Sequence, residues 1–155
     1  MDKQPQPTQL VDLSPFFVEQ PLGPSTLAEV YARWSELHDI GGIASFVGQV
    51  RADSHEHGTV RGIEFTAQQE MATTAAWNFV AQTVAATPDQ PLAIYMRHRL
   101  GFVPTGQWPV LIVVGSAHRD VAFTICRTLI DNLKAQCPIF GKEQLSGGGH
   151  RWKEA

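Results

Sequence analysis

The chain has 155 residues, of which 43% are hydrophobic and 17% are charged, a balance typical of one globular domain with a full core. Its formal net charge of −3 argues against a general nucleic-acid-binding protein, which would normally carry a surplus of basic residues. Local clusters of basic residues remain possible at this net charge. An anionic small molecule or a partner's carboxylate is therefore a better candidate ligand than a nucleic-acid duplex.

The N-terminal segment "MDKQPQPTQL" is polar, so it lacks the apolar core of a secretion signal, and no apolar run approaches the length of a membrane span. The two cysteines, Cys126 and Cys137, do not have metal-binding spacing. We therefore expect a cytoplasmic protein with reduced, buried thiols. Residues 1–8 are expected to form a flexible tail, and residues 9–155 a single domain.

In the first half of the chain, the sequence pattern predicts one helix among short strands. The helix is expected over residues 24–38, and the strands over residues 8–17, 43–51 and 60–67. Thr26 and Glu29 match a capping box at the start of the helix. A polar loop separates the last two strands, which we therefore expect to pair as a hairpin with a long tip.

The second half predicts two long helices. The first, residues 68–86, is rich in alanine. Its candidate core positions are Met71, Ala75, Val80 and Val84. Strands are predicted over 91–101 and 110–117, and the β-branched run of the second is typical of a central strand buried on both faces.

The second long helix is predicted over residues 119–136, with its end enforced by Pro138. One face of it carries the apolar side chains Ala122, Ile125, Leu129 and Leu133. Residues 139–155 predict two short strands around a glycine turn. Because hairpins are mixed with two long helices, we expect an α+β fold rather than a doubly wound sheet.

Two of the chain's four lysines stand close together in "DNLKAQCPIFGKE". Lys134 lies on the flank of the helix's apolar face, and Lys142 follows the proline turn. Lys134 is either a solvent-facing cation favoured by the helix dipole or a lysine at the edge of a cleft. In the second case the two ammonium groups could hold an anion between them.

Other basic residues could complete such a site. His118-Arg119 stands at a predicted helix start, where backbone N–H groups attract anions, although simple capping explains the pair equally well. Arg51 ends a strand and would add a further cation. The segment Arg97-His98-Arg99 is either structural or part of the cleft border. His55-Glu56-His57 lacks helical metal-ligand spacing, so we expect no metal.

Five segments, in this order, resemble the large subunit of molybdopterin synthase: "FVGQVR", "HRLG", "SAHRDVAF", "DNLKAQCPIFGKE" and "HRWKEA". The resemblance implies an α/β hammerhead-type fold with an additional antiparallel β subdomain, a homodimer and no cofactor. It also implies a heterotetramer with a small ubiquitin-like sulfur carrier that ends in a Gly-Gly thiocarboxylate. In this family two sulfurs pass from the carrier to cyclic pyranopterin monophosphate, which forms the dithiolene of molybdopterin.

The resemblance also assigns roles to individual residues. Contact with the pterin is implied for Gln49, Val50 and Arg51, and contact with the phosphate for His118 and Arg119. Lys134 matches the lysine where the carrier tail enters, and Gly141, Lys142 and Glu143 match a closing substrate-binding tripeptide. Lys134 and Lys142 are the predicted catalytic residues.

One departure from the family pattern affects the catalytic assignment. Relatives commonly read Trp-Lys-Lys-Glu or Trp-Lys-Arg-Glu where this chain has Phe140-Gly141-Lys142-Glu143. Glycine therefore replaces one of the two lysines usually assigned to catalysis, and we expect Lys142 to take its place, because lysine has a long, flexible side chain. The alternatives are a dimeric module that docks the carrier without turnover and a general anion- or nucleotide-binding domain.

Overall fold

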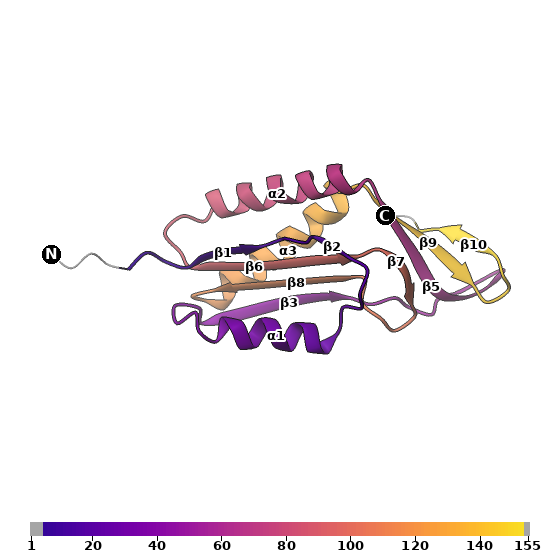
Figure 1. Ribbon diagram of the computed structural model, residues 1–155, viewed down its shortest axis with the longest axis horizontal. Coiled ribbons are helices and arrows are strands. Elements are labelled where there is room, and N and C mark those ends of the chain that lie inside the picture. Colours follow the sequence, from indigo (N-terminus) through magenta and orange to yellow (C-terminus); the bar gives the residue numbers. More distant parts are fainter. Residues whose placement is uncertain (1–4, 154–155) are drawn as a thin grey trace.

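The computed structural model describes residues 5–153, which form three helices and two five-stranded sheets. The two sheets follow one another along the long axis of the molecule (Figure 1). Residues 1–4 of the predicted tail lie outside this range. Within residues 5–153, none of the helices combines the length and the hydropathy that a membrane span requires.

The first sheet is the larger body of the molecule. Its strands, in spatial order, are β1 (Gln9–Asp12), β6 (Leu92–Arg99), β8 (Val110–Ser116) and β3 (Gly42–Gly48), with β2 (Phe17–Val18) also paired to β6. β1 and β2 run parallel to β6, whereas β6–β8 and β8–β3 are antiparallel. Every residue of β6 and β8 is buried, which confirms the prediction of a central strand at 110–117.

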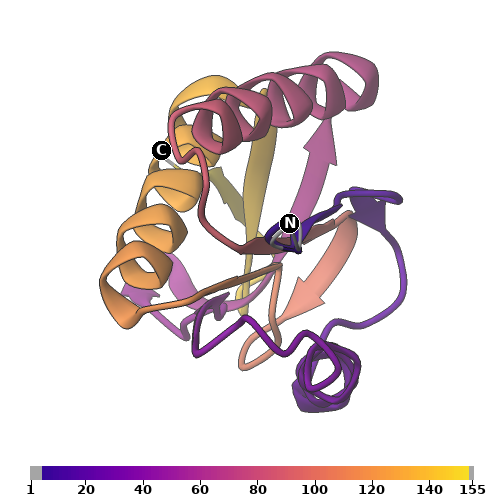
Figure 2. The same cartoon turned by 90° about the vertical axis from the view of Figure 1, so that its left-hand side faces the viewer.

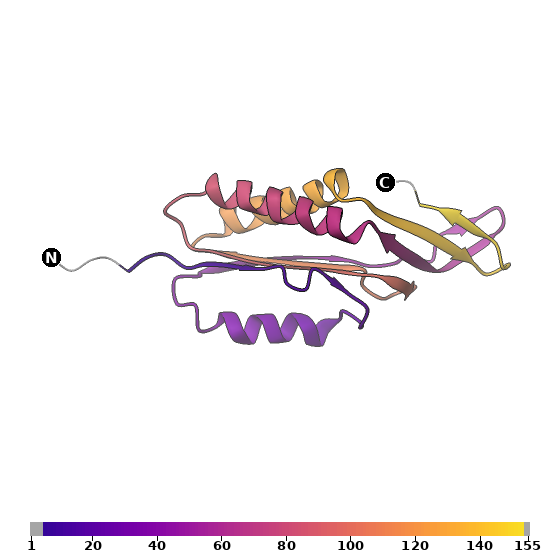
Figure 3. The ribbon, with the colours of Figure 1, turned by 45° about the horizontal axis from the view of Figure 1, so that its top comes forward.

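Helices cover both faces of this sheet. α1 (Pro24–Trp34) lies on one face, and α2 (Gln69–Ala85) and α3 (Arg119–Gln136) lie on the other (Figures 2 and 3). Successive side chains of a strand point to opposite faces. Ile94 and Met96 accordingly belong to the core under α2 and α3, and Tyr95 belongs to the core under α1. Burial on both faces explains why the two central strands lack alternating polarity.

The predicted helices form, with local corrections. α3 has the predicted bounds, and its four predicted core positions are all buried. In α2 the prediction of Met71 as a core residue is wrong, because its side chain is 65% exposed and the buried face passes through Ala72, Ala76 and Phe79.

α1 is shorter than predicted and begins one residue after Gly23, which is its N-cap. Thr26 lies inside the helix, where its hydroxyl oxygen accepts a hydrogen bond from the Gly23 N–H at 3.2 Å. The predicted pairing of Thr26 with Glu29 as a capping box is therefore wrong, because the helix starts three residues earlier than that pattern requires.

The second sheet is entirely antiparallel. Its strands, in spatial order, are β10 (His150–Trp152), β9 (Ile139–Leu145), β5 (Gly58–Ala67) and β4 (Ser54–His55), with β7 (Gly101–Pro104) also paired to β5. It has a small core of its own, which includes Val50, Val60, Ile63, Val103 and Leu145. The two sheets confirm the expected α+β class with an additional antiparallel subdomain.

The predicted hairpin between strands 43–51 and 60–67 does not form. β3 pairs with β8 in the first sheet, whereas β5 pairs with β7 and β9 in the second. The segment between them carries the chain from one sheet to the other. Both strands therefore pair with partners that are distant in the sequence.

Candidate active site

A cavity of about 460 Å³ lies where the end of α3 meets the second sheet. We call it the apolar cavity, because most of its wall is apolar, including Phe65, Leu133, Ile139, Phe140 and Trp152. Three ionisable groups besides Cys137 also line it: His98, Lys134 and Lys153. Phe140 and Trp152 are exposed, so the cavity opens to solvent on their side.

α3 brings Lys134 to this cavity. Leu133, its neighbour, is buried in the core, and Pro138 prevents the helix from continuing. The Lys134 side chain therefore leaves the last helical turn beside the core and lines the cavity mouth, where it remains exposed. Lys134 is thus both a lysine at a cavity edge and a cation near a helix C-terminus, where the helix dipole favours it. Lys142, expected to share the site with it, lines neither cavity.

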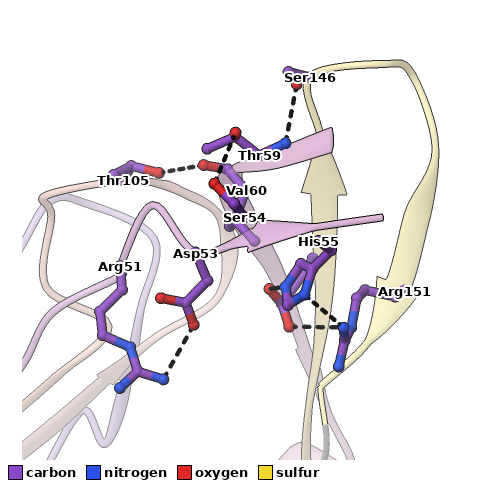
Figure 4. A network of polar contacts seen from close by, with 10 residues as sticks. Arg51, Asp53, Ser54, His55, Thr59, Val60, Thr105, Ser146 and Arg151 are labelled. Atoms are coloured by element: carbon purple, nitrogen blue, oxygen red, sulfur yellow. Dashed lines mark hydrogen bonds and ion pairs between the residues drawn. The ribbon is translucent and has the colours of Figure 1, made fainter. Parts of the chain in front are cut away.

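A second cavity, of about 190 Å³, lies between the strands of the second sheet and the segment after β3. We call it the polar cavity, because its lining is mainly polar: Gln49, Arg51, Asp53, His55, Glu143 and Arg151. Arg51 is exposed and forms an ion pair with Asp53 at 3.1 Å (Figure 4). Guanidinium groups in such a lining are suited to bidentate binding of phosphate.

Glu143 is held in place at the floor of the polar cavity. Its carboxylate accepts a hydrogen bond from His55 Nε2 at 3.2 Å and lies 3.6 Å from Nε of Arg151. The Arg151 guanidinium, which can only donate, bonds to His55 Nδ1 at 2.8 Å (Figure 4). Because Glu143 is 7% exposed, these two partners compensate for the burial of its charge.

Lys153 lines both cavities and therefore joins them. Partial burial lowers the pKa of Lys153, and the nearby Lys134 ammonium lowers it further. The sequence prediction missed this residue. The sequence shows that Lys153 follows the last predicted strand, β10. It does not show the pairing register of β10 with β9, which is a tertiary property and which sets Lys153 beside Gly141.

Several predicted site residues lie elsewhere. Val50 is 2% exposed in the core of the second sheet, so its side chain is a packing group. His118 and Arg119 stand at the opposite end of α3 from Lys134, more than about 20 Å along the helix axis. A single chain therefore does not form the predicted cradle of Arg51, His118-Arg119 and the lysines.

Lys142 lines neither cavity. Along β9 the residues alternate, so Gly141 and Glu143 are buried while Lys142 is directed to the other face. There its Nζ lies 5.7 Å from the centre of the Trp152 ring. Of the predicted substrate-binding residues, Gln49, Arg51 and Glu143 line the polar cavity, and Lys134 and Gly141 line the apolar one.

His98 is buried in the wall of the apolar cavity, while its neighbours Arg97 and Arg99 bond to the protein. His98 Nδ1 donates to the carbonyl oxygen of Arg99 at 2.9 Å. Burial lowers the pKa of His98 to about 4, and Lys134 contributes to the lowering. Arg97 binds Asp12, and Arg99 binds Gln107, so the segment is partly structural and partly a cavity border.

We expect His98 to make the protein less stable as the pH falls from about 6.5 to about 4. Across that range the unfolded chain binds a proton that the folded chain excludes, so up to about 3 kcal/mol of unfolding free energy is lost. Urea denaturation at several pH values would measure this. His98→Gln should flatten the dependence, whereas the exposed control His38→Gln should retain it, and equal slopes in both would contradict the assignment.

The two cysteines are structural. Both are buried and free, and burial raises the pKa of each thiol to about 11. Neither is therefore an available thiolate near neutral pH, as the sequence predicts. Among residues 5–153, no group of three or more His, Cys, Asp or Glu side chains is placed to hold a metal ion.

Comparison with known proteins places these features in a family. The family described as MoaE protein matches residues 18–136. A molybdopterin synthase catalytic subunit of Arabidopsis thaliana is 41% identical over 80% of this chain and 61% of its own length. The chain thus spans about three fifths of that relative. The Haemophilus influenzae catalytic subunit is 34% identical over 94% of this chain and 93% of its own length.

Solved structures show the same fold. Molybdopterin synthase from Staphylococcus aureus superposes with a TM-score of 0.76, at 24% identity, over 90% of this chain and 96% of that one. A complex of subunits 1 and 2 of molybdopterin-converting factor from Helicobacter pylori gives a TM-score of 0.72, at 19% identity, over 93% and 90%. With motifs, family match and fold in agreement, the chain belongs to the MoaE family of molybdopterin synthase catalytic subunits.

Proposed function

We propose that this chain is the catalytic subunit of a cytoplasmic molybdopterin synthase. It transfers two sulfurs from the thiocarboxylated C-terminus of a small ubiquitin-like carrier to cyclic pyranopterin monophosphate, forming the dithiolene of molybdopterin. Relatives at 34–41% identity carry the name of that subunit. The observation that carries the proposal is that the cavity at Lys134 adjoins, through Lys153, a second cavity lined by Arg51 and Arg151.

The two cavities suit the two reactants. A tail ending in two glycines has no side chains there and can enter the apolar cavity, where the Lys134 ammonium can bind its terminal anion. The guanidinium groups of Arg51 and Arg151 can bind the phosphate of the substrate, and Gln49 can hydrogen-bond its ring. The reacting sulfur and its acceptor would then meet at the junction of the cavities.

We also propose that the chain acts as a homodimer within a heterotetramer. His118 and Arg119 are too far from Lys134 to reach the same ligand within one chain, so they can serve the substrate only if a second copy supplies them. They lie beside β3, the edge strand of the first sheet, where the backbone of Arg119 approaches Gly42. Ile43 and Phe123 are exposed apolar side chains on the adjoining strand and helix.

Reconstitution tests the activity. Purified protein mixed with thiocarboxylated carrier and cyclic pyranopterin monophosphate should form dithiolene product, detected after oxidation as a fluorescent pterin. The control is the same carrier with an ordinary carboxylate, which should give none. Carrier binding without product at any ratio would instead support a non-catalytic docking module. Displacement of the pterin by nucleotides would support a general anion-binding domain.

A further inference from the structure

Gly141 lines the apolar cavity at a place where little room is left for a side chain of its own. It stands in β9 and is buried against Ile63 and Phe65 of the neighbouring strand. A Cβ atom at position 141 would lie 3.0 Å from Ile63 Cγ2, 3.3 Å from Phe65 Cε1 and 3.7 Å from Lys153 Cβ. A side chain at position 141 would therefore start next to the point from which the Lys153 side chain departs.

Strand pairing places Lys153 opposite Gly141. The Lys153 N–H donates to the Gly141 carbonyl at 2.8 Å, directly after the pair Trp152–Lys142 in the β9–β10 ladder. Residues opposite each other in an antiparallel pair share a face of the sheet, and neighbours along a strand alternate. Lys153 therefore shares the face of Gly141, whereas Lys142 and Trp152 occupy the other face.

The charges around Lys153 are those of a site that binds an anion. It borders the two cavities, with Lys134 on the apolar side and Arg51 on the polar side. Both cations lower the pKa of Lys153, after burial as the main cause, while Glu143 and Asp53 raise it. His98, His55 and Arg151 are the other ionisable groups along these walls, apart from Cys137. An incoming anion at the junction would relieve the repulsion among the three cations.

We propose that Lys153 is the second catalytic lysine of this site and that its ammonium, together with that of Lys134, binds the terminal thiocarboxylate of the carrier tail. Lys153 thereby replaces the side chain that Gly141 lacks, and Lys142 does not. The inference rests on the proposed function for its reaction. Its geometric content, an anion-binding amine at the junction of two cavities, can be tested without turnover.

Paired variants test the proposal through activity. Lys153→Ala should slow dithiolene formation about 100-fold, the usual effect of removing one group that stabilises developing charge. Lys142→Ala, from the paired strand but the opposite face, should change the rate less than about threefold. Lys153→Arg, which keeps the charge, should retain carrier binding. A wild-type rate in folded Lys153→Ala, or an equal loss in Lys142→Ala, would overturn the assignment.

A binding experiment separates this inference from the proposed activity. A carrier-tail peptide ending in Gly-Gly with an ordinary carboxylate would be titrated into wild-type protein and each variant. Lys153→Ala should weaken its affinity about tenfold, and Lys142→Ala should leave it unchanged. If wild-type protein binds the peptide but forms no product, the proposed function fails. The affinities of wild type and Lys153→Ala for the peptide still decide whether Lys153 binds the terminal anion. Equal affinity in wild type and Lys153→Ala would refute the role of Lys153. Thermal unfolding of each variant, with Lys153→Met as a length-matched form, verifies folding.

Discussion

Replacing Lys134 with alanine should lower the rate of dithiolene formation about 1,000-fold, the largest effect expected from a single side chain in this protein. Lys134 lines the apolar cavity from the last turn of α3, where no other basic residue of that helix lies near it. Its loss would leave the terminal anion of the carrier without its helix-side cation. The rate would be measured with saturating carrier and substrate, so that a weaker affinity is not mistaken for a slower reaction.

Arg127→Ala is the matched control for this prediction. Arg127 is a cation on the same helix, but its side chain is 84% exposed and it pairs with Asp131 four residues later. Its replacement should leave the rate within about twofold of wild type. Lys134→Arg would distinguish charge from proton transfer, because a guanidinium keeps the charge but does not release a proton near neutral pH. Full activity in Lys134→Ala would remove the basis for the proposed reaction site.

Replacing Arg97 with methionine should lower the free energy of unfolding by about 3 kcal/mol or more, because it breaks a largely buried ion pair from one side. The Arg97 guanidinium donates to Asp12 Oδ1 at 2.7 Å and to backbone carbonyls of Asp12, Ser14 and Met96. These bonds join the end of β1 and the segment that follows it to β6. Methionine fills a similar volume but satisfies none of the acceptors.

The same change at an exposed pair isolates the effect of burial. Arg127→Met removes the partner of Asp131 on the surface of α3 and should cost less than about 0.5 kcal/mol. Urea denaturation of both variants at pH 7 gives the comparison. Similar losses would mean that burial of the Arg97–Asp12 pair does not determine its contribution. The activity of folded Arg97→Met should remain, because Arg97 lines neither cavity.

Local patterns in the sequence predicted much of the fold. The β-branched run at 110–117 required burial on both faces, and that strand is β8, between β6 and β3. The apolar spacing of 119–136, stopped by Pro138, predicted α3 and the place of Lys134 at its end. Such features are predictable because hydrophobic periodicity and proline geometry act over a few residues. The five ordered motifs predicted the family, because each motif is a short stretch that can be recognised in the sequence without the structure.

Strand pairing, by contrast, was decided only by the tertiary structure. The expected hairpin between 43–51 and 60–67 gave way to two sheets, because each strand gained partners distant in the sequence. The pairing of β9 with β10 placed Lys153 opposite Gly141 and set Lys142 on the other face, away from the cavities. Local sequence thus determined the long elements and the position of Lys134, whereas register between strands determined which second lysine lies at the cavities. A shift of one residue reverses the face of every side chain in a strand, and no local pattern specifies it here.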